Sequence, residues 1–123
     1  MASFENGALV ISWGSAIPGR EARMLDVLNG VFEYTRNLER AGRIDQTRVF
    51  VSTTGPNRDT MMVFGRLDEL TKLLIDDEFE GQLQDGMMVV QDLNIALWAG
   101  GLRDELTDGL IRHAQKLHSH GLV

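Results

Sequence analysis

One stretch, residues 60–83, constrains the fold more than any other part of the sequence. It reads TMMVFGRLDELTKLLIDDEFEGQL. A short apolar run that favours a β-strand ends at Gly65, and leucines at helical spacing follow directly. Asp76 and Asp77 interrupt the helical pattern, which resumes toward Phe79. The sequence therefore predicts a strand that passes at once into a helix, with a break in that helix.

Four segments are predicted to be strands because they are rich in β-branched, aromatic and other apolar residues: 8–13, 44–53, 60–64 and 87–99. The second and third are joined by a short segment with turn composition, so we expect them to pair antiparallel. In the last and longest strand the odd-numbered positions are apolar apart from Gln91. One face of this strand is therefore expected to pack against helices.

Three segments carry apolar residues at spacings of three and four, which is typical of amphipathic helices: 20–41, 67–86 and 103–119. Gly42 follows the first helix at a position where helices commonly end. Gly30 lies inside that helix, where glycine costs about 1 kcal/mol relative to alanine. We therefore expect a close packing contact at Gly30.

The predicted order is β-α-β-β-α-β with an added C-terminal helix. This is an α+β, ferredoxin-like arrangement with an antiparallel sheet. Both core helices lie on one face of such a sheet, so the other face is left open. An open face that carries valine, methionine, tryptophan and phenylalanine is a large apolar patch, and such patches usually mark interfaces. We expect a homodimer in which two open sheet faces meet.

The length of 123 residues is that of one domain. We assign residues 1–101 to the sheet domain and 102–123 to a helical extension of it. The net charge of −6 argues against a nucleic-acid partner, and no apolar run is long enough to span a membrane. The absence of cysteine and of a signal-peptide pattern at the start leads us to expect a cytoplasmic protein.

Two short segments carry a family resemblance: ISWG at residues 11–14, and VFGRLDEL at residues 63–70. Together with the order of elements, they resemble the dimeric α/β-barrel superfamily over roughly residues 7–101, and in particular its small uncharacterised bacterial members. Relatives include small monooxygenases that act on polyketide-like aromatics, haem-degrading enzymes, muconolactone isomerases, chlorite dismutases and stress-responsive proteins. The resemblance implies a cavity between helices and sheet, or inside the dimer barrel. It implies no single reaction.

Several of these relatives use a histidine in or beside the cavity. The histidines of this chain are His113, His118 and His120, all in the C-terminal extension. Haem ligation and histidine-dependent catalysis are therefore not expected. His113 and His118 are five residues apart and do not share a helix face. We interpret the three as a solvated helix end, and predict no metal and no cofactor.

Two other segments have a functional and a structural interpretation. The acidic residues 76–80 lack the alternating ligands of a calcium loop, and a second helix start capped by Asp76 or Asp77 accounts for them. The loop at residues 14–20 joins a strand to a helix, where phosphates often bind. It contains neither a dinucleotide-binding fingerprint nor a P-loop lysine. We predict a plain connection there.

Aromatic and polar residues that strand alternation directs toward a cavity form the candidate ligand pocket: Trp13, Tyr34, Arg48, Asp92, Asn94 and Trp98. Such groups can hold a planar substrate and polarise its oxygen. The alternative, favoured because nothing in the sequence shows that these residues converge, is structural. In it the two tryptophans fill the core or the dimer interface, and Arg48 pairs with Asp92.

The sequence thus predicts a small homodimeric α/β-barrel protein that binds a small apolar or aromatic molecule. The alternative is a cofactor-independent monooxygenase or isomerase acting on an aromatic or polyketide-like substrate. Any chemistry is expected on the first and last strands. A third hypothesis is that the C-terminal amphipathic helix docks on another protein.

Overall fold

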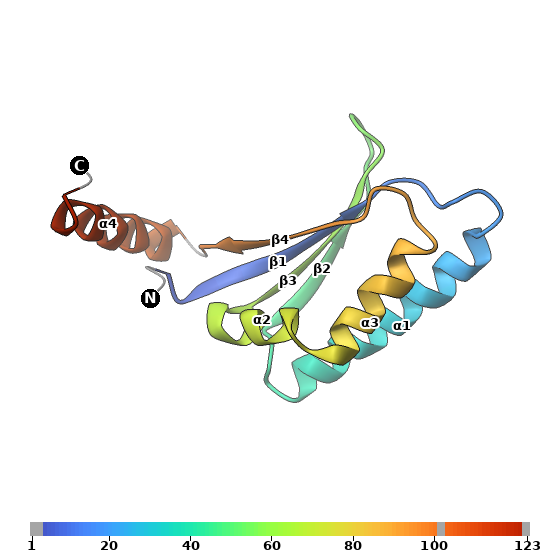
Figure 1. Cartoon of the computed structure of the whole chain (residues 1–123), viewed down its shortest axis with the longest axis horizontal. Helices are drawn as coiled ribbons and strands as arrows, with labels where there is room; N and C mark the ends of the chain where they lie inside the picture. Colours follow the sequence, from blue (N-terminus) through green and yellow to red (C-terminus); the bar gives the residue numbers. More distant parts are fainter. Residues whose placement is uncertain (1–3, 101–102, 122–123) are drawn as a thin grey trace.

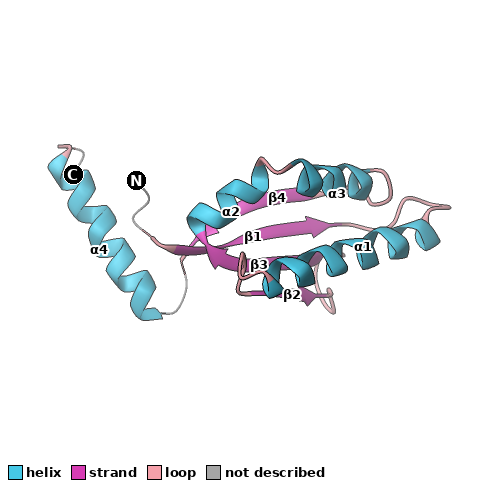
Figure 2. Ribbon diagram, turned by 90° about the horizontal axis from the view of Figure 1, so that it is seen from below, coloured by secondary structure: helices cyan, strands magenta, loops and turns pink. Residues whose placement is uncertain are grey.

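The computed structural model describes residues 4–100 and 103–121, and within them the chain forms an α+β fold (Figures 1 and 2). The elements are β1 (Asn6–Trp13), α1 (Glu21–Arg40), β2 (Gln46–Phe50), β3 (Asp59–Arg66), α2 (Leu67–Leu74), α3 (Asp77–Met87), β4 (Asn94–Ala99) and α4 (Arg103–Ser119). This arrangement fits a ferredoxin-like fold in which the second helix is divided into α2 and α3.

The four strands form one antiparallel sheet in the order β2-β3-β1-β4. The central strand β1 pairs with β3 and β4, so that Leu9 lies opposite both Val63 and Leu97. The antiparallel pairing of β2 with β3 is confirmed. Helices α1, α2 and α3 lie on one side of the sheet, and the other face of the sheet is left uncovered (Figure 1).

The two faces of the sheet differ in burial because successive side chains of a strand point in opposite directions. On the helix-covered face, Leu9, Met61 and Val63 are almost fully buried. The register places another set of residues on the opposite face, which we call the open face: Ala8, Val10, Ser12, Gln46, Arg48, Phe50, Thr60, Met62, Phe64, Asn94, Ala96 and Trp98. On it, Phe50 is 50% exposed and Trp98 is 56% exposed.

The join between β3 and α2 lies where the sequence predicts it. The strand extends to Arg66, and the helix begins at Leu67, whose backbone N–H donates to the Glu5 carbonyl oxygen at 2.8 Å. Leu70 and Leu73 are buried on the inner face of α2. The chain leaves the helix at Ile75 and α3 starts two residues later. The predicted break in the helix is confirmed.

The predicted strand at residues 87–99 is wrong over its first half. Met87 ends α3, Val90 makes a single bridge with Ala16, and β4 spans only Asn94–Ala99. The N–H groups of Val89 and Val90 both donate to the Gly86 carbonyl at 3.0 Å, which closes the helix end. Asp92 has a φ of 53°, a left-handed conformation that interrupts an extended strand. A short apolar run does not distinguish a helix end from a strand.

Two smaller predictions are also corrected. The second strand ends at Phe50 rather than at residue 53, because the Ser52 N–H donates to the Asp59 carboxylate at 3.1 Å and begins the turn. The close contact expected at Gly30 is absent. A Cβ at Gly30 would meet no atom nearer than the Gln82 side-chain oxygen at 3.9 Å, which is ordinary van der Waals distance.

Helix α4 matches the predicted C-terminal helix and lies apart from the sheet and the other helices (Figures 1 and 2). Gly109 packs against the ring of Phe4, while Leu110 and Ile111 are exposed. The predicted boundary between residues 101 and 102 lies outside the described residues. Among the helices of the described ranges, none is both long and apolar enough to cross a membrane.

Candidate functional site

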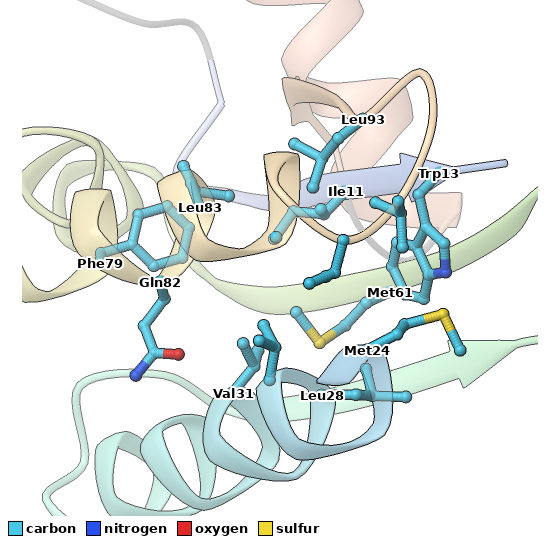
Figure 3. A pocket seen from close by; sticks show the side chains of 14 residues that line it. Ile11, Trp13, Met24, Leu28, Val31, Met61, Phe79, Gln82, Leu83 and Leu93 are labelled. Atoms are coloured by element: carbon cyan, nitrogen blue, oxygen red, sulfur yellow. The ribbon is translucent and has the colours of Figure 1, made fainter. Parts of the chain in front are cut away.

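The candidate site is a cavity between the helix-covered face of the sheet and helices α1 and α3 (Figure 3). Its volume is about 60 Å³. Residues from both strands and helices line it, among them Ile11, Trp13, Met24, Leu28, Val31, Met61, Phe79, Gln82, Leu83 and Leu93. The walls are therefore almost entirely apolar.

The cavity follows from how α1 and α3 lie over the sheet. Met24, Leu28 and Val31 recur at spacings of four and three on α1, so they share the face that points to the sheet. Ile11 and Met61 are cross-strand partners on β1 and β3 and lie across the cavity from them. None of the described lining residues has a titratable side chain. The cavity is thus suited to binding an apolar group by burial.

The size of the cavity sets what it can hold without rearrangement. A cavity of roughly 150 Å³ lined by aliphatic and aromatic side chains accommodates benzene, whereas this one has about 60 Å³. A ring therefore fits only if lining side chains move. Met24 and Met61 both line the cavity, and methionine changes shape readily because it is unbranched and has three rotatable bonds.

Two predicted pocket residues lie at or beside this cavity. Trp13 is buried and forms one end of its wall. Tyr34 is buried on α1, where its ring lies 6.3 Å from that of Phe79 and its hydroxyl donates to Asp76 at 3.4 Å. Burial and the negative charges of Asp76 and Glu78 raise the pKa of Tyr34 to about 12. The Tyr34 hydroxyl is therefore a core hydrogen-bond donor.

The other four predicted residues lie elsewhere. Arg48 and Trp98 line a depression on the open face of the sheet. Asp92 and Asn94 are exposed where β4 begins, and the Asn94 amide donates to the Asp92 carbonyl at 3.4 Å. The same carbonyl accepts from Arg58 at 2.6 Å. The six predicted residues thus divide among separate places instead of forming one pocket.

The alternative interpretation of these residues is correct in one part. Trp13 fills the helix-covered side of the core. Arg48 and Asp92 form no ion pair in the described part of the chain. Ion pairs found there include Arg43–Glu69, Arg66–Asp68 and Lys72–Glu69. Arg48 is on the open face of β2, whereas the backbone carbonyl of Asp92 accepts a hydrogen bond from Arg58.

Most of the cavity lining was not predicted as a site. Its residues are those of an ordinary core, and the spacing of Met24, Leu28 and Val31 indicates only a buried helix face. Gln82 gives the one distinctive signal. It lies beside Leu83 and three residues after Phe79, both on the inner face of α3, so an uncharged polar residue stands among apolar positions.

The acidic and histidine segments have structural positions. Asp76 caps α3, since its carboxylate accepts from the N–H groups of Glu78 at 3.0 Å and Phe79 at 3.2 Å. The predicted helix cap is confirmed. The histidines at 113, 118 and 120 are exposed on or just after α4. Among the side chains that the structure describes, in residues 4–100 and 107–121, no three histidine or acidic groups gather in a way that would hold a metal ion.

Comparisons with known proteins show the fold and no more. No protein-family model matches the chain, and no curated protein is similar to it at a significant level. The chain is similar to a solved structure described as a conserved protein from Methanosarcina mazei Go1, with a TM-score of 0.63 and 14% sequence identity. That match covers 80% of this chain and 96% of the other. The chain therefore has the α+β fold of that protein.

Proposed function

We propose that the protein binds a small apolar or aromatic molecule in the cavity between the sheet and helices α1 and α3. The observation that carries this proposal is the apolar wall of the cavity, which comes from four elements and includes Trp13 and Phe79. Small-molecule sites are concave and mostly apolar, with few polar groups. Two flexible methionines, Met24 and Met61, allow the wall to adapt to a ring.

The alternative function, a cofactor-independent monooxygenase or isomerase, requires groups that polarise a substrate or move a proton. The described cavity walls supply one amide, that of Gln82, and no titratable side chain. Arg48, Asp92 and Asn94, which would serve such chemistry, are outside the cavity. Binding without chemistry is therefore the function that we favour.

We further propose that two copies of the chain associate through their open faces to form a dimeric α/β barrel. Phe50 and Trp98 are exposed on that face, and Met62 and Phe64 lie between them in the register. Helices cover only the opposite side of the sheet (Figure 1). A second copy would remove this apolar surface from water, which supports a self-complementary two-fold interface.

Calorimetric titration with p-xylene tests the binding proposal. We expect the wild-type protein to bind p-xylene, and Val31→Phe to abolish binding because the larger side chain fills the cavity. Leu25→Phe is the matched control, since Leu25 is on the same helix and 56% exposed. Wild-type protein that does not bind p-xylene, or equal binding by both variants, contradicts the proposal.

Sedimentation equilibrium tests the dimer. We expect wild-type protein to sediment as a dimer and Trp98→Glu to sediment as a monomer, because a charge on the open face would be buried without a partner. Ile75→Glu is the control, since Ile75 is 80% exposed at the end of α2 on the helix side. A monomeric wild type, or a dimer that survives Trp98→Glu, contradicts the interface.

A further inference from the structure

We infer that Gln82 selects the ligand: the cavity takes an apolar molecule with a ring and one hydroxyl or carbonyl group, which hydrogen-bonds to the Gln82 amide. This inference rests on the proposed function and adds the chemical class of the ligand. It is carried by an amide in an otherwise apolar wall and by the lack of a protein partner for that amide.

The Gln82 amide is at the edge of the cavity, between two helices. The side chain extends from α3 toward α1, and the amide lies at the opposite end of the view from Trp13 (Figure 3). Within the part of the chain that the structure describes, no protein group forms a hydrogen bond with it. Gln84, on the same helix, instead donates to Glu80 at 3.5 Å. The Gln82 amide is thus available to a ligand.

Gly30 lies next to this amide and is not itself among the residues that line the cavity. It faces Gln82 from α1, and the position of a Cβ on Gly30 would be 3.9 Å from the Gln82 side-chain oxygen. Residue 30 therefore places no side chain against the amide. Glycine is unfavourable inside a helix, and its φ here is not one that requires glycine. A Cβ on residue 30 would be in ordinary van der Waals contact with the Gln82 oxygen, so the glycine leaves that side of the amide without a side chain against it.

Apart from Gln82, the wall of the cavity has few polar atoms that could hydrogen-bond to a ligand. Trp13 carries the other polar atom among the labelled residues, and its indole nitrogen lies on the side of the ring away from Ile11 (Figure 3). An amide can both donate and accept a hydrogen bond. Gln82 therefore suits either a hydroxyl or a carbonyl group, while the apolar wall disfavours ligands with a second polar group or a charge.

Two probes of nearly equal size test the inference: p-cresol and p-xylene, which differ by a hydroxyl in place of a methyl group. Each is titrated calorimetrically into the wild-type protein, Gln82→Met and Gln84→Met. Methionine keeps the length of glutamine and removes its hydrogen bonds. Gln84→Met is the matched control, because Gln84 is exposed on the same helix and outside the cavity.

We expect Gln82→Met to weaken p-cresol binding by about 3- to 10-fold, the effect of losing one hydrogen bond, and to leave p-xylene binding unchanged or stronger. Gln84→Met should change neither. The side-chain amide NMR signals of Gln82 should shift more with p-cresol than with p-xylene, because only p-cresol can form a hydrogen bond with the amide. Equal weakening of both probes, or none, overturns the role of Gln82 while p-xylene binding still supports the cavity. Wild-type protein that binds neither probe overturns both proposals.

Discussion

At the scale of single residues, the polar side chains in and near the core differ in whether the protein satisfies them. The Tyr34 hydroxyl donates to Asp76. The Thr47 hydroxyl is buried with no hydrogen-bond partner in the described structure, although the Thr47 N–H donates to Glu39 at 2.8 Å. A buried polar group without a partner lowers stability because it has lost its bonds to water.

Thr47→Val should therefore raise the free energy of unfolding by about 1 kcal/mol, because valine has the same shape and no hydroxyl to satisfy. Urea denaturation measures the change. Thr53→Val is the control, since Thr53 is exposed and its replacement should change stability by less than about 0.5 kcal/mol. A loss of stability in Thr47→Val would show that the hydroxyl has a partner in the native protein.

Tyr34 makes stability depend on pH in the alkaline range. Its pKa in the folded protein is about 12, above the value of about 10 that an unfolded chain has. A raised pKa gives a contribution that is complete below pH about 10 and is lost as pH rises toward about 12. We expect the free energy of unfolding to fall over this interval, and to fall less in Tyr34→Phe.

Two measurements check this prediction. Tyr34 is the single tyrosine of the chain, so tyrosinate absorbance reports its titration directly in folded and denatured protein. Urea denaturation at several alkaline pH values gives the stability of wild type and Tyr34→Phe. The same midpoint in folded and denatured protein, or the same loss of stability in both proteins, would contradict a raised pKa.

At the scale of elements, the break between α2 and α3 depends on one side chain. Asp76 accepts hydrogen bonds from two backbone N–H groups that the first turn of α3 leaves without helical partners. Its neighbour Asp77 is in that first turn, where a negative charge interacts favourably with the helix dipole. The two aspartates are adjacent and have different roles.

Asp76→Ala should lower the free energy of unfolding by about 1–2 kcal/mol, because both cap hydrogen bonds are lost. Asp77→Ala should lower it by only about 0.3–0.5 kcal/mol, since it removes a charge and no cap. Thermal and urea denaturation of the two variants give the comparison. Equal losses in the two variants would mean that charge, rather than the cap, stabilises the start of α3.

Helix and strand boundaries could be predicted where a residue type favours one structure only. Glycine and leucine spacing place the join after β3, and the aspartates place the restart of the helix. The structure after α3 could not be predicted, because residues 87–90 are all apolar and such a run fits either a helix end or a strand. The deciding features are the hydrogen bonds to the Gly86 carbonyl and the backbone at Asp92, which tertiary packing sets.

At the scale of the whole molecule, the fold has two apolar regions with different geometry. The cavity lies between helices and sheet, whereas the open face is a broad surface with Phe50 and Trp98 exposed on it. Strand alternation predicts a face that packs against helices and an opposite face that differs from it. It does not predict which residues meet in space: Trp13 and Trp98, both candidates for one pocket, point to opposite faces of the sheet.

The family resemblance implies a cavity between helices and sheet, but its size and lining could not be predicted from the sequence pattern. A space between packed layers depends on how far α1 and α3 lie from the sheet, and periodicity only indicates which helix face is buried. Gln82 is the one lining residue whose chemistry departs from a core pattern. The homodimer and the cytoplasmic location that the sequence suggests remain predictions.

The methionine methyl NMR spectrum during titration with p-xylene is the most direct test of the proposed site. Met24 and Met61 line the cavity, Met62 is on the open face, and Met87 and Met88 are exposed near the end of α3. We predict that the signals of Met24 and Met61 shift and that those of the other three stay in place. Shifts at Met62 with none at Met24 and Met61 would place the ligand on the open face and contradict the proposal.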